Sequence, residues 1–333
     1  MSDPRPQDVS VVIAVKADNP NLRESLAHLV SLEDAPGEII VLPDAPFEPP
    51  PGVRVIPTGP TGPSEKRDIG AAAAGGSILA FLDDDAYPAP GWLRAATAAF
   101  AEPGVGAVGG PGVTPSSDPF LAQVSGDVYA SPLVSGPHVR RYLPRAATAV
   151  DDWPSCNLLV RSSAFHRAGG FDSTYWPGED TVFCLKLTHD LGLEIRYVPE
   201  ALVYHHRRPG VRRHLRQAAQ YALHRGYFVK RFPQTSRRPS YFAPSALVMW
   251  ITAGWLPGLR NRRLRLVWAG GVAAYVAALA VVTPTKGRPA RYALALVGSI
   301  ATHLTYGLWF MRGLLARRIP DERSAPPPPE VSQ

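Results

Sequence analysis

Three consecutive aspartates, Asp83, Asp84 and Asp85, end an apolar segment in the stretch FLDDDAYPAPGWL. Their carboxylate oxygens are hard ligands that suit Mg²⁺ or Mn²⁺, and a metal held by one or two carboxylates shares its other positions with water and phosphate oxygens. A metal-bound nucleoside diphosphate is the ligand that this chemistry favours. An acidic turn that caps the next helix would look the same, so the triplet alone leaves both interpretations open.

A second acidic pair, Glu179 and Asp180, follows a Pro-Gly turn in GGFDSTYWPGEDTVFCLKL and is expected to start a helix. Backbone N–H groups at a helix N-terminus hold a carboxylate and keep it ionised. Such a group is either a cap or a well-oriented general base. Taken alone, the pair is more typical of a cap.

Short apolar, β-branched runs predict the strands that must position these acids. We expect strands at residues 9–15, 38–42, 53–56, 77–82, 107–110, 157–161, 194–198 and 201–204, and helices at residues 21–31, 64–74 and 181–191. This alternation predicts an α/β fold with a doubly wound, mostly parallel sheet. Ligands of such sheets bind beyond the carboxyl ends of the strands, so the aspartate triplet lies where a site is expected.

Five stretches in order, VSVVIAV, EIIVLPD, SEKRDIGAAAAGGSILAFLDDD, GGFDSTYWPGEDTVFCLKL and PEALVYHHRR, resemble a family 2 glycosyltransferase with a GT-A fold over roughly residues 8–232. The resemblance implies inverting transfer of a sugar from a nucleotide-diphosphate sugar, with Mg²⁺ or Mn²⁺ at the D-x-D motif. It implies Asp83 on the sugar side and Asp85 on the metal, with Asp84 also at the donor. It implies Asp180, with Glu179 beside it, as the catalytic base.

Further donor-binding positions follow from the same resemblance. Ala14 and Lys16 after the first strand, and Asp44 after the second, are implied to hold the nucleotide base. The chain reads AVKADN and PDAPFE where the family commonly has Pro-Thr-Tyr-Asn and Asp-Asp-Gly-Ser, so the nucleotide stays open. Lys66 and Arg67 match the family's Ala-Arg-Asn stretch in part, and a cation there suits a diphosphate.

Three more residues complete the expected site. His205 matches the family's Val-x-His position and is implied to complete the metal site or touch phosphate. Trp153 and Trp176 flank the expected acceptor side, where they would stack on a sugar or prenyl chain; a place in the core is an equal alternative. Asp180 would accept the proton of an attacking hydroxyl, or orient the acceptor if that is an already ionised lipid phosphate.

The charges divide the chain into two different parts. Residues 1–200 have 14 Lys+Arg and 25 Asp+Glu, a net charge of −11, whereas residues 201–320 have 20 Lys+Arg and no acidic residue. The two cysteines, Cys156 and Cys184, lack metal-finger spacing and fit a reducing compartment. The N-terminus lacks the basic region and long apolar core of a signal peptide, so a cytosolic catalytic domain is expected.

The basic part also contains the membrane segments that we expect. Residues 207–238 combine arginines with spaced apolar residues, as in an amphipathic helix on an anionic membrane surface. Residues 266–283 and 292–315 are long enough to cross a bilayer, and residues 242–256 form either a third span or an interfacial helix. Because cytosolic loops are rich in Lys and Arg, two spans with an interfacial helix are favoured.

These signals predict four regions in a multi-pass protein of the cell membrane. They are a catalytic domain at 1–206, a basic amphipathic or interfacial segment at 207–257, transmembrane helices at 258–318 and a disordered, proline-rich tail at 319–333. The expected partners are a nucleotide-sugar donor, a lipid-linked or polyprenyl-phosphate acceptor and membrane lipids.

Three rival functions were weighed against this prediction. Processive polysaccharide synthases carry a Gln-x-x-Arg-Trp motif, whereas residues 216–221 read RQAAQY, which favours single-sugar transfer. A catalytically silent membrane scaffold has no need of Asp83, Asp85 and Asp180. A nucleic-acid partner is not expected, because the basic segment directly precedes apolar spans and therefore fits lipid headgroups better than phosphodiesters.

Overall fold

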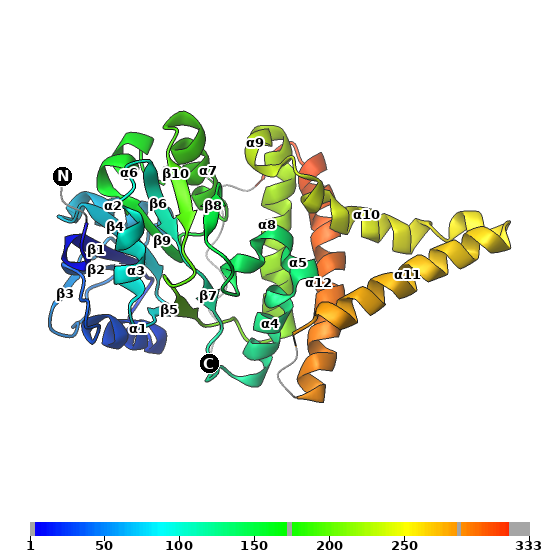
Figure 1. Cartoon of the computed structure of the whole chain (residues 1–333), viewed down its shortest axis with the longest axis horizontal. Helices are drawn as coiled ribbons and strands as arrows, with labels where there is room; N and C mark the ends of the chain where they lie inside the picture. The colour runs from blue at the N-terminus through cyan, green and yellow to red at the C-terminus, as the bar shows by residue number, and fades with distance from the viewer. Residues whose placement is uncertain (1–3, 172–174, 285–287, 320–333) are drawn as a thin grey trace.

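The computed structural model describes residues 4–171, 175–284 and 288–319. An α/β domain forms one end of the molecule, and helices from the last third of the chain pack beside it and extend away from it (Figure 1). All of the predicted proline-rich tail except Ile319 lies outside the described residues.

The α/β domain is built on an eight-stranded sheet of order β3-β2-β1-β4-β9-β6-β10-β8. Its strands are β1 (Val9–Ala14), β2 (Glu38–Leu42), β3 (Val53–Val55), β4 (Ile78–Asp83), β6 (Val105–Gly109), β8 (Thr148–Val150), β9 (Asn157–Arg161) and β10 (Glu194–Tyr197). The first four strands in this order are parallel, while β9 runs antiparallel to β4 and β6, and β8 runs antiparallel to β10. The prediction of a mostly parallel α/β sheet is confirmed.

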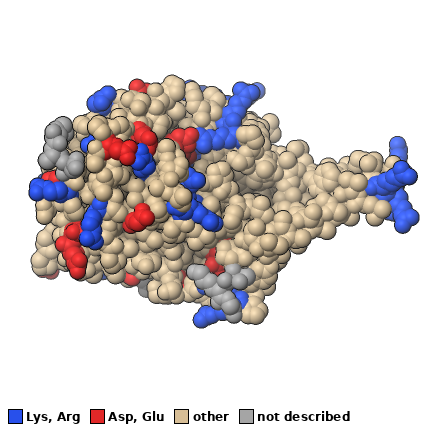
Figure 2. All heavy atoms as spheres, in the orientation of Figure 1, with Lys and Arg blue, Asp and Glu red and all other residues tan. Residues whose placement is uncertain are grey.

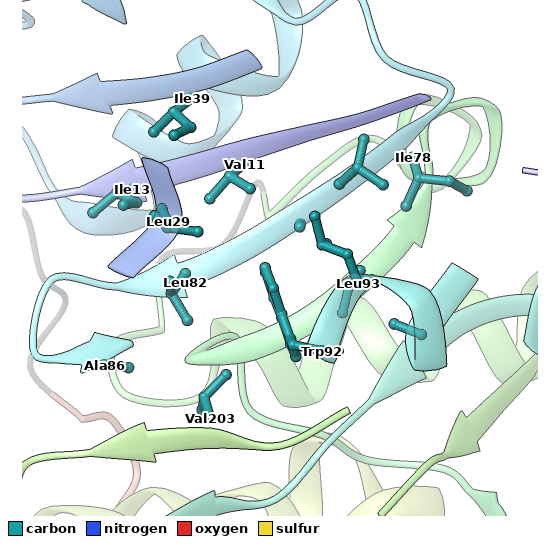
Figure 3. Close-up of a cluster of buried hydrophobic side chains, with 14 of the residues drawn as sticks. Val11, Ile13, Leu29, Ile39, Ile78, Leu82, Ala86, Trp92, Leu93 and Val203 are labelled. Atoms are coloured by element: carbon teal, nitrogen blue, oxygen red, sulfur yellow. The ribbon is translucent and has the colours of Figure 1, made fainter. Parts of the chain in front are cut away.

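The central strands are apolar because both faces of the sheet are covered. Val11 and Ile13 of β1 belong to one buried cluster, and Val12 between them belongs to the cluster on the other face. Figure 3 shows the first cluster, in which Trp92 and Leu93 of α3 (Trp92–Ala99) lie against the strands. This alternation produces the continuous apolar runs seen in the sequence.

Helices of the α/β domain follow the strands. They are α1 (Pro20–Val30), α2 (Pro63–Ala73), α3, α4 (Phe120–Ala130), α5 (Pro132–Ser135), α6 (Ser162–Ala168) and α7 (Glu179–Leu185), with short 3-10 segments at Pro6–Asp8 and Gly136–Arg141. The predicted helix at 181–191 starts earlier, at Glu179, and its second half, Lys186–Asp190, widens into a π-helical turn.

A second sheet of three short strands lies beside the carboxyl end of β4. It pairs β5 (Ala86–Pro88) antiparallel with β11 (Val203–His205), which in turn pairs with β7 (Gly112–Val113). His205 is the register partner of Ala86. The small sheet therefore brings His205 next to the aspartate triplet, more than 100 residues away in sequence.

The last third of the described chain is helical. It comprises α8 (Val211–Arg231), α9 (Pro233–Ser236), α10 (Pro239–Ala253), a 3-10 turn at Leu256–Leu259, α11 (Arg262–Val282) and α12 (Pro289–Leu315). Helix α8 lies between the α/β domain and α12, and α10 and α11 form a projecting hairpin (Figure 1). The amphipathic pattern of α8 therefore serves packing inside the protein, and contact between this segment and the membrane stays a prediction.

Within the described residues, three helices are long and apolar enough to cross a membrane: Pro239–Leu259, Arg262–Val282 and Pro289–Leu315. The segment at 242–256, for which we favoured an interfacial position, belongs to the first of them. Length and composition therefore allow more spans than the two favoured from the loop charges.

Candidate active site

The expected metal ligands, Asp85 and His205, lie together with Asp83, the residue expected on the sugar side, at the carboxyl end of β4. Asp83, Asp85 and His205 each offer a ligand atom, and these atoms all lie within 4.8 Å of one another. His205 Nε2 is 3.0 Å from Asp85 Oδ1. Two carboxylates and an imidazole fit Mn²⁺ or Mg²⁺. Three protein ligands would leave the other coordination positions of either ion open for water and phosphate.

The charges of this cluster are strongly coupled. Burial disfavours ionisation of both partners, yet their attraction raises the pKa of His205 to about 10 and lowers the pKa of Asp85. Burial, and then the neighbouring Asp85, raise the pKa of Asp84 to about 6, and the Asp84 carboxylate accepts a hydrogen bond of 2.8 Å from Asn19. Asp84 therefore points to the start of α1 and does not belong to the cluster of Asp83, Asp85 and His205.

Arg67 of α2 connects the two acidic motifs. Its guanidinium donates to Asp83 Oδ1 at 2.8 Å and to Glu179 Oε1 at 3.2 Å, and it lies over the ring of Phe171. Only 6% of Arg67 is exposed. The structure therefore brings the Glu-Asp pair to the same side of the sheet as the aspartate triplet, which is the arrangement that sugar transfer requires.

The Glu-Asp pair starts α7 beside this arginine. Burial, and then the charge of Asp180, raise the pKa of Glu179 to about 8. Burial, and then the charge of Asp152, raise the pKa of Asp180, whose Oδ1 accepts a hydrogen bond of 2.7 Å from the Thr181 N–H. An elevated pKa makes a carboxylate a stronger base.

The expected nucleotide-binding residues surround the ends of β1 and β2. Lys66 is almost fully buried, pairs with Asp44 and donates to the Val15 carbonyl at 2.7 Å. Ala14 ends β1, and the Lys16 carbonyl accepts from the Asp44 N–H at 3.0 Å. Lys66 therefore neutralises Asp44 and fixes the two strand-end loops to each other.

Asp152 was not singled out from the sequence, yet it is buried next to Asp180. It accepts from Arg225 of α8 at 2.9 Å, from Thr181 Oγ1 at 3.2 Å, and lies 3.4 Å from Arg141. Burial opposes its ionisation, but the two arginines lower the pKa of Asp152. The sequence signal was weak, two adjacent acids before Trp153, because Arg225 comes from a segment 73 residues away.

The two tryptophans of the expected acceptor side differ in position. Trp153 is 1% exposed and belongs to the second core cluster, so its ring contributes to the core. Trp176 is 41% exposed, three residues before Glu179. Trp176 is therefore the one that can meet an acceptor.

A buried sheet end that gathers carboxylates, a histidine and cations is the arrangement of an enzyme for nucleotide-linked substrates. Residues 78–312 match the model of Glycosyl transferase family group 2, and the chain belongs to this family. The resemblance seen in the sequence is confirmed.

Similar proteins agree with this assignment. The chain is 30% identical over 268 residues to the pre-mycofactocin glycosyltransferase of two Mycobacterium tuberculosis strains, covering 77% of this chain and 55% of the relative. It thus spans about half the length of these relatives. The mannosyltransferase PcManGT from Pyrobaculum calidifontis, solved with GDP-Man and Mn²⁺, has a similar structure, with TM-score 0.53, 19% identity, and coverage of 94% of this chain and 88% of that chain. This likeness shows the GT-A fold.

Proposed function

We propose that the chain transfers a sugar, with inversion, from a nucleotide-diphosphate sugar to a lipid-linked or membrane-proximal acceptor at the cytoplasmic side of the cell membrane. One observation carries the proposal: Arg67 joins Asp83 of the metal-ligand cluster to Glu179 of the acidic pair. A donor bound at the cluster therefore has a candidate base within the same site.

Asp83, Asp85 and His205 would hold Mg²⁺ or Mn²⁺ on the donor diphosphate. A divalent metal there supplies charge stabilisation for the leaving nucleoside diphosphate. Arg67, whose charge is fixed at any working pH, orients Asp83 toward this position. Lys66 and Asp44 keep the two loops of the expected nucleotide side in place.

Asp180 is the proposed base. The acceptor hydroxyl attacks the anomeric carbon, its proton passes to the Asp180 carboxylate, and the bond between the anomeric carbon and the diphosphate oxygen breaks with its electrons leaving on the diphosphate. This single displacement inverts the anomeric centre. The charge of Asp152, held by Arg225 and Arg141, favours proton uptake by Asp180.

The position of α8 supports an acceptor at the membrane. Arg225 of α8 donates to Thr181 Oγ1 at 3.2 Å, next to the proposed base, and the opposite side of α8 packs on α12. The site is therefore one helix away from the apolar helices, close enough for an acceptor headgroup whose tail stays in lipid.

A donor screen tests the proposal. Purified full-length chain with Mn²⁺ or Mg²⁺ is incubated with nucleotide-sugars and polyprenyl phosphates, lipid-linked sugars or pre-mycofactocin, and release of nucleoside diphosphate is measured. We expect metal-dependent release that needs both donor and acceptor and disappears in Asp180→Asn. Binding of nucleotide without turnover of any donor would instead support the silent scaffold, and release of long polymers would support a processive synthase.

A further inference from the structure

We propose that only the hairpin of α10 and α11 crosses the hydrocarbon core of the lipid bilayer, and that α12 lies along the membrane surface, docked on the catalytic domain. The inference concerns membrane topology and uses the membrane attachment of the proposed function, not sugar transfer. It differs from the two-span arrangement favoured by loop charges, and also from three spans.

Helix α12 is fixed to α8 along half of its length. A Cβ at Gly313 would lie 2.0 Å from the Leu223 carbonyl oxygen, and a Cβ at Gly226 would lie 2.1 Å from the Phe310 carbonyl oxygen. The two backbones therefore touch at two glycines. Hydrogen bonds from His214 to Thr302 and from Lys230 to the Ala316 carbonyl extend this contact at both ends.

This packing means that α12 and α8 lie at the same depth relative to the membrane. The two helices run side by side from Thr302 to Ala316, about 20 Å at 1.5 Å per residue. The exposed cations of α8 are Arg212, Arg213, Arg216, Lys230 and Arg231. If α12 crossed the bilayer, these charges would enter hydrocarbon with it, where unpaired cations are costly.

The first half of α12 is fixed to α4, here by a buried ion pair. Arg291 is 5% exposed and forms a two-pronged ion pair with Asp127, one prong 2.8 Å long, and it donates to the Gln123 carbonyl at 3.3 Å. Ser299, Thr302 and His303 are also buried on this helix. The face of α12 toward the protein therefore holds its buried polar groups among apolar residues such as Ala295 and Phe310, and the opposite face, with Leu294, Val297 and Leu308, is apolar and exposed. A helix with polar groups on one side and an open apolar side suits the membrane surface.

The hairpin has the opposite character. Helix α11 has no charged residue after Arg265 and is exposed on nearly all sides, with Leu266, Val267, Val276 and Val281 among its open side chains. A helix that is apolar all round belongs in lipid. Pro239–Leu259 and Arg262–Val282 have 21 residues each, about 31 Å, close to a hydrocarbon core of about 30 Å. The near part of each arm lies beside α12, where Ser245 donates to the Gly307 carbonyl at 2.9 Å and Tyr275 hydrogen-bonds His303 at 2.8 Å, and the rest projects away from it (Figure 1).

The two arms of the hairpin are joined near its tip. Trp268 donates its indole N–H to the Trp250 carbonyl at 3.0 Å, and the Trp250 ring lies over Gly271. Figure 2 shows a projection without charge along its flanks and with a basic group at its end. That group is Arg260, Arg262, Arg263 and Arg265, all exposed. These arginines suit the phosphates of the far headgroup layer.

The distribution of arginines between loops argues for a different topology, but packing outweighs it. Keeping the tip arginines on the cytosolic side requires α11 and α12 to cross instead. That crossing would separate α12 from α8 and α4 or carry their charges into lipid. Arginines at a helix end need only reach the interface, so placing them beyond the far side is the smaller cost.

Single cysteines distinguish the topologies. In full-length Cys156→Ser chain, where the remaining Cys184 is buried, we introduce Leu259→Cys at the tip, Val281→Cys at the end of α11 and Leu315→Cys at the end of α12. All three side chains are exposed, between 68% and 84%. Arg94→Cys on the catalytic domain marks the near side. Right-side-out and inverted vesicles are then labelled with a membrane-impermeant maleimide.

We expect Leu259→Cys to react from the far side, and Val281→Cys and Leu315→Cys to react from the near side. Reaction of Leu315→Cys from the far side would show three spans and overturn the inference. Reaction of Leu259→Cys from the near side, or from neither side, would overturn it as well. The readout does not depend on catalysis, so failure of the proposed function leaves it intact.

Spin labels at Val297→Cys and Leu308→Cys provide a second measurement. These positions share the exposed face of α12 and are about 16 Å apart along the helix. A helix in the membrane surface gives both labels the same ratio of oxygen to polar-quencher accessibility, within about twofold. A clearly deeper position for one of them would contradict the in-plane placement.

Discussion

The chemistry of single residues is most directly tested at Asp180. Replacing this carboxylate by an amide removes the proposed proton acceptor and retains the shape of the side chain. We expect Asp180→Asn to lower kcat by about 10²–10⁴-fold, the usual contribution of a positioned general base. Asp190→Asn, at an exposed acid just after the same helix, should retain activity. Equal losses in both variants would contradict a catalytic role.

The pH dependence of activity follows from the raised pKa of Asp180. The base acts only when ionised, so kcat/KM is expected to fall as pH falls through that pKa, at a higher pH than the ordinary value of about 3.9 for aspartate. The activity is measured at saturating metal, so that protonation of the proposed metal ligands does not contribute to this acidic side of the pH profile. Asp152→Asn removes one of the charges that raise the pKa of Asp180, so the acidic side should move to lower pH. An unmoved acidic side in a folded Asp152→Asn variant would reject this explanation.

Arg67 hydrogen-bonds Asp83, a proposed metal ligand, and is not itself proposed to bind the metal. A lysine retains the charge but cannot donate to Asp83 and Glu179 together, because it presents a single ammonium. We expect Arg67→Lys to raise the Mn²⁺ concentration that gives half-maximal activity by about 10–100-fold, as for other residues that hydrogen-bond metal ligands. The matched exchange Arg54→Lys, at an exposed arginine of β3, should have no effect on a Mn²⁺ titration of activity.

Local motifs predicted part of the site because its acids stand in short, recognisable stretches. Asp85 and His205, the expected metal ligands, lie close together, and Asp83, which was expected on the sugar side, lies with them. The sequence did not indicate Asp152 and Arg225, because their role depends on an ion pair between residues 73 positions apart, which no local spacing reveals. The arginine also stood in a segment whose charges were assigned to the membrane, although its side chain faces the catalytic domain.

Among the elements, buried strands were predicted best. The strands at 38–42 and 157–161 have the expected bounds, because their side chains are buried on both faces. The short strands β5, β7 and β8 have two or three residues each, too few for a period to appear. The antiparallel direction of β9 depends on how the chain returns through α4 and α5, a route that hydrophobic pattern does not encode.

One buried ion pair, between Asp127 and Arg291, joins α12 to α4 beside a small apolar cluster of Val124, Val128 and Ala295. Removing one partner leaves an unpaired buried charge, which typically costs about 3–5 kcal/mol. We expect Asp127→Asn to lower the thermal unfolding temperature measured in detergent. The double variant Asp127→Leu with Arg291→Leu removes both charges and should lose much less. If both variants unfold at the same temperature, the pair is not what stabilises this contact.

At the scale of the molecule, charge and hydropathy separate two tasks. The acidic first 200 residues supply the eight-stranded sheet, and Asp83 and Glu179 meet there at Arg67. The described residues of the acid-free segment from 201 to 320 form β11 and then helices, of which α8 and α12 pack beside the domain and α10 and α11 project from it (Figure 1). The sequence predicted this division and the presence of apolar helices. It did not predict that α12 packs on the domain, because its buried polar residues are spread thinly among apolar ones.

The chain could be held at the membrane by insertion of apolar helices or by attraction between its arginines and lipid phosphates, and a salt wash distinguishes the two. In about 1 M NaCl the Debye length falls to about 3 Å, so surface attraction is screened, whereas apolar burial persists. We expect the chain to remain in the membrane pellet after salt and alkaline carbonate washes. Ala273→Glu with Val276→Glu, two exposed positions near the middle of α11, should release it, because each charge near the bilayer centre costs about 2.5–3.5 kcal/mol. Val211→Glu, the same change at an exposed position of α8, should remain bound. Release of the native chain by salt alone would show that its arginines, not the hairpin, hold it at the membrane.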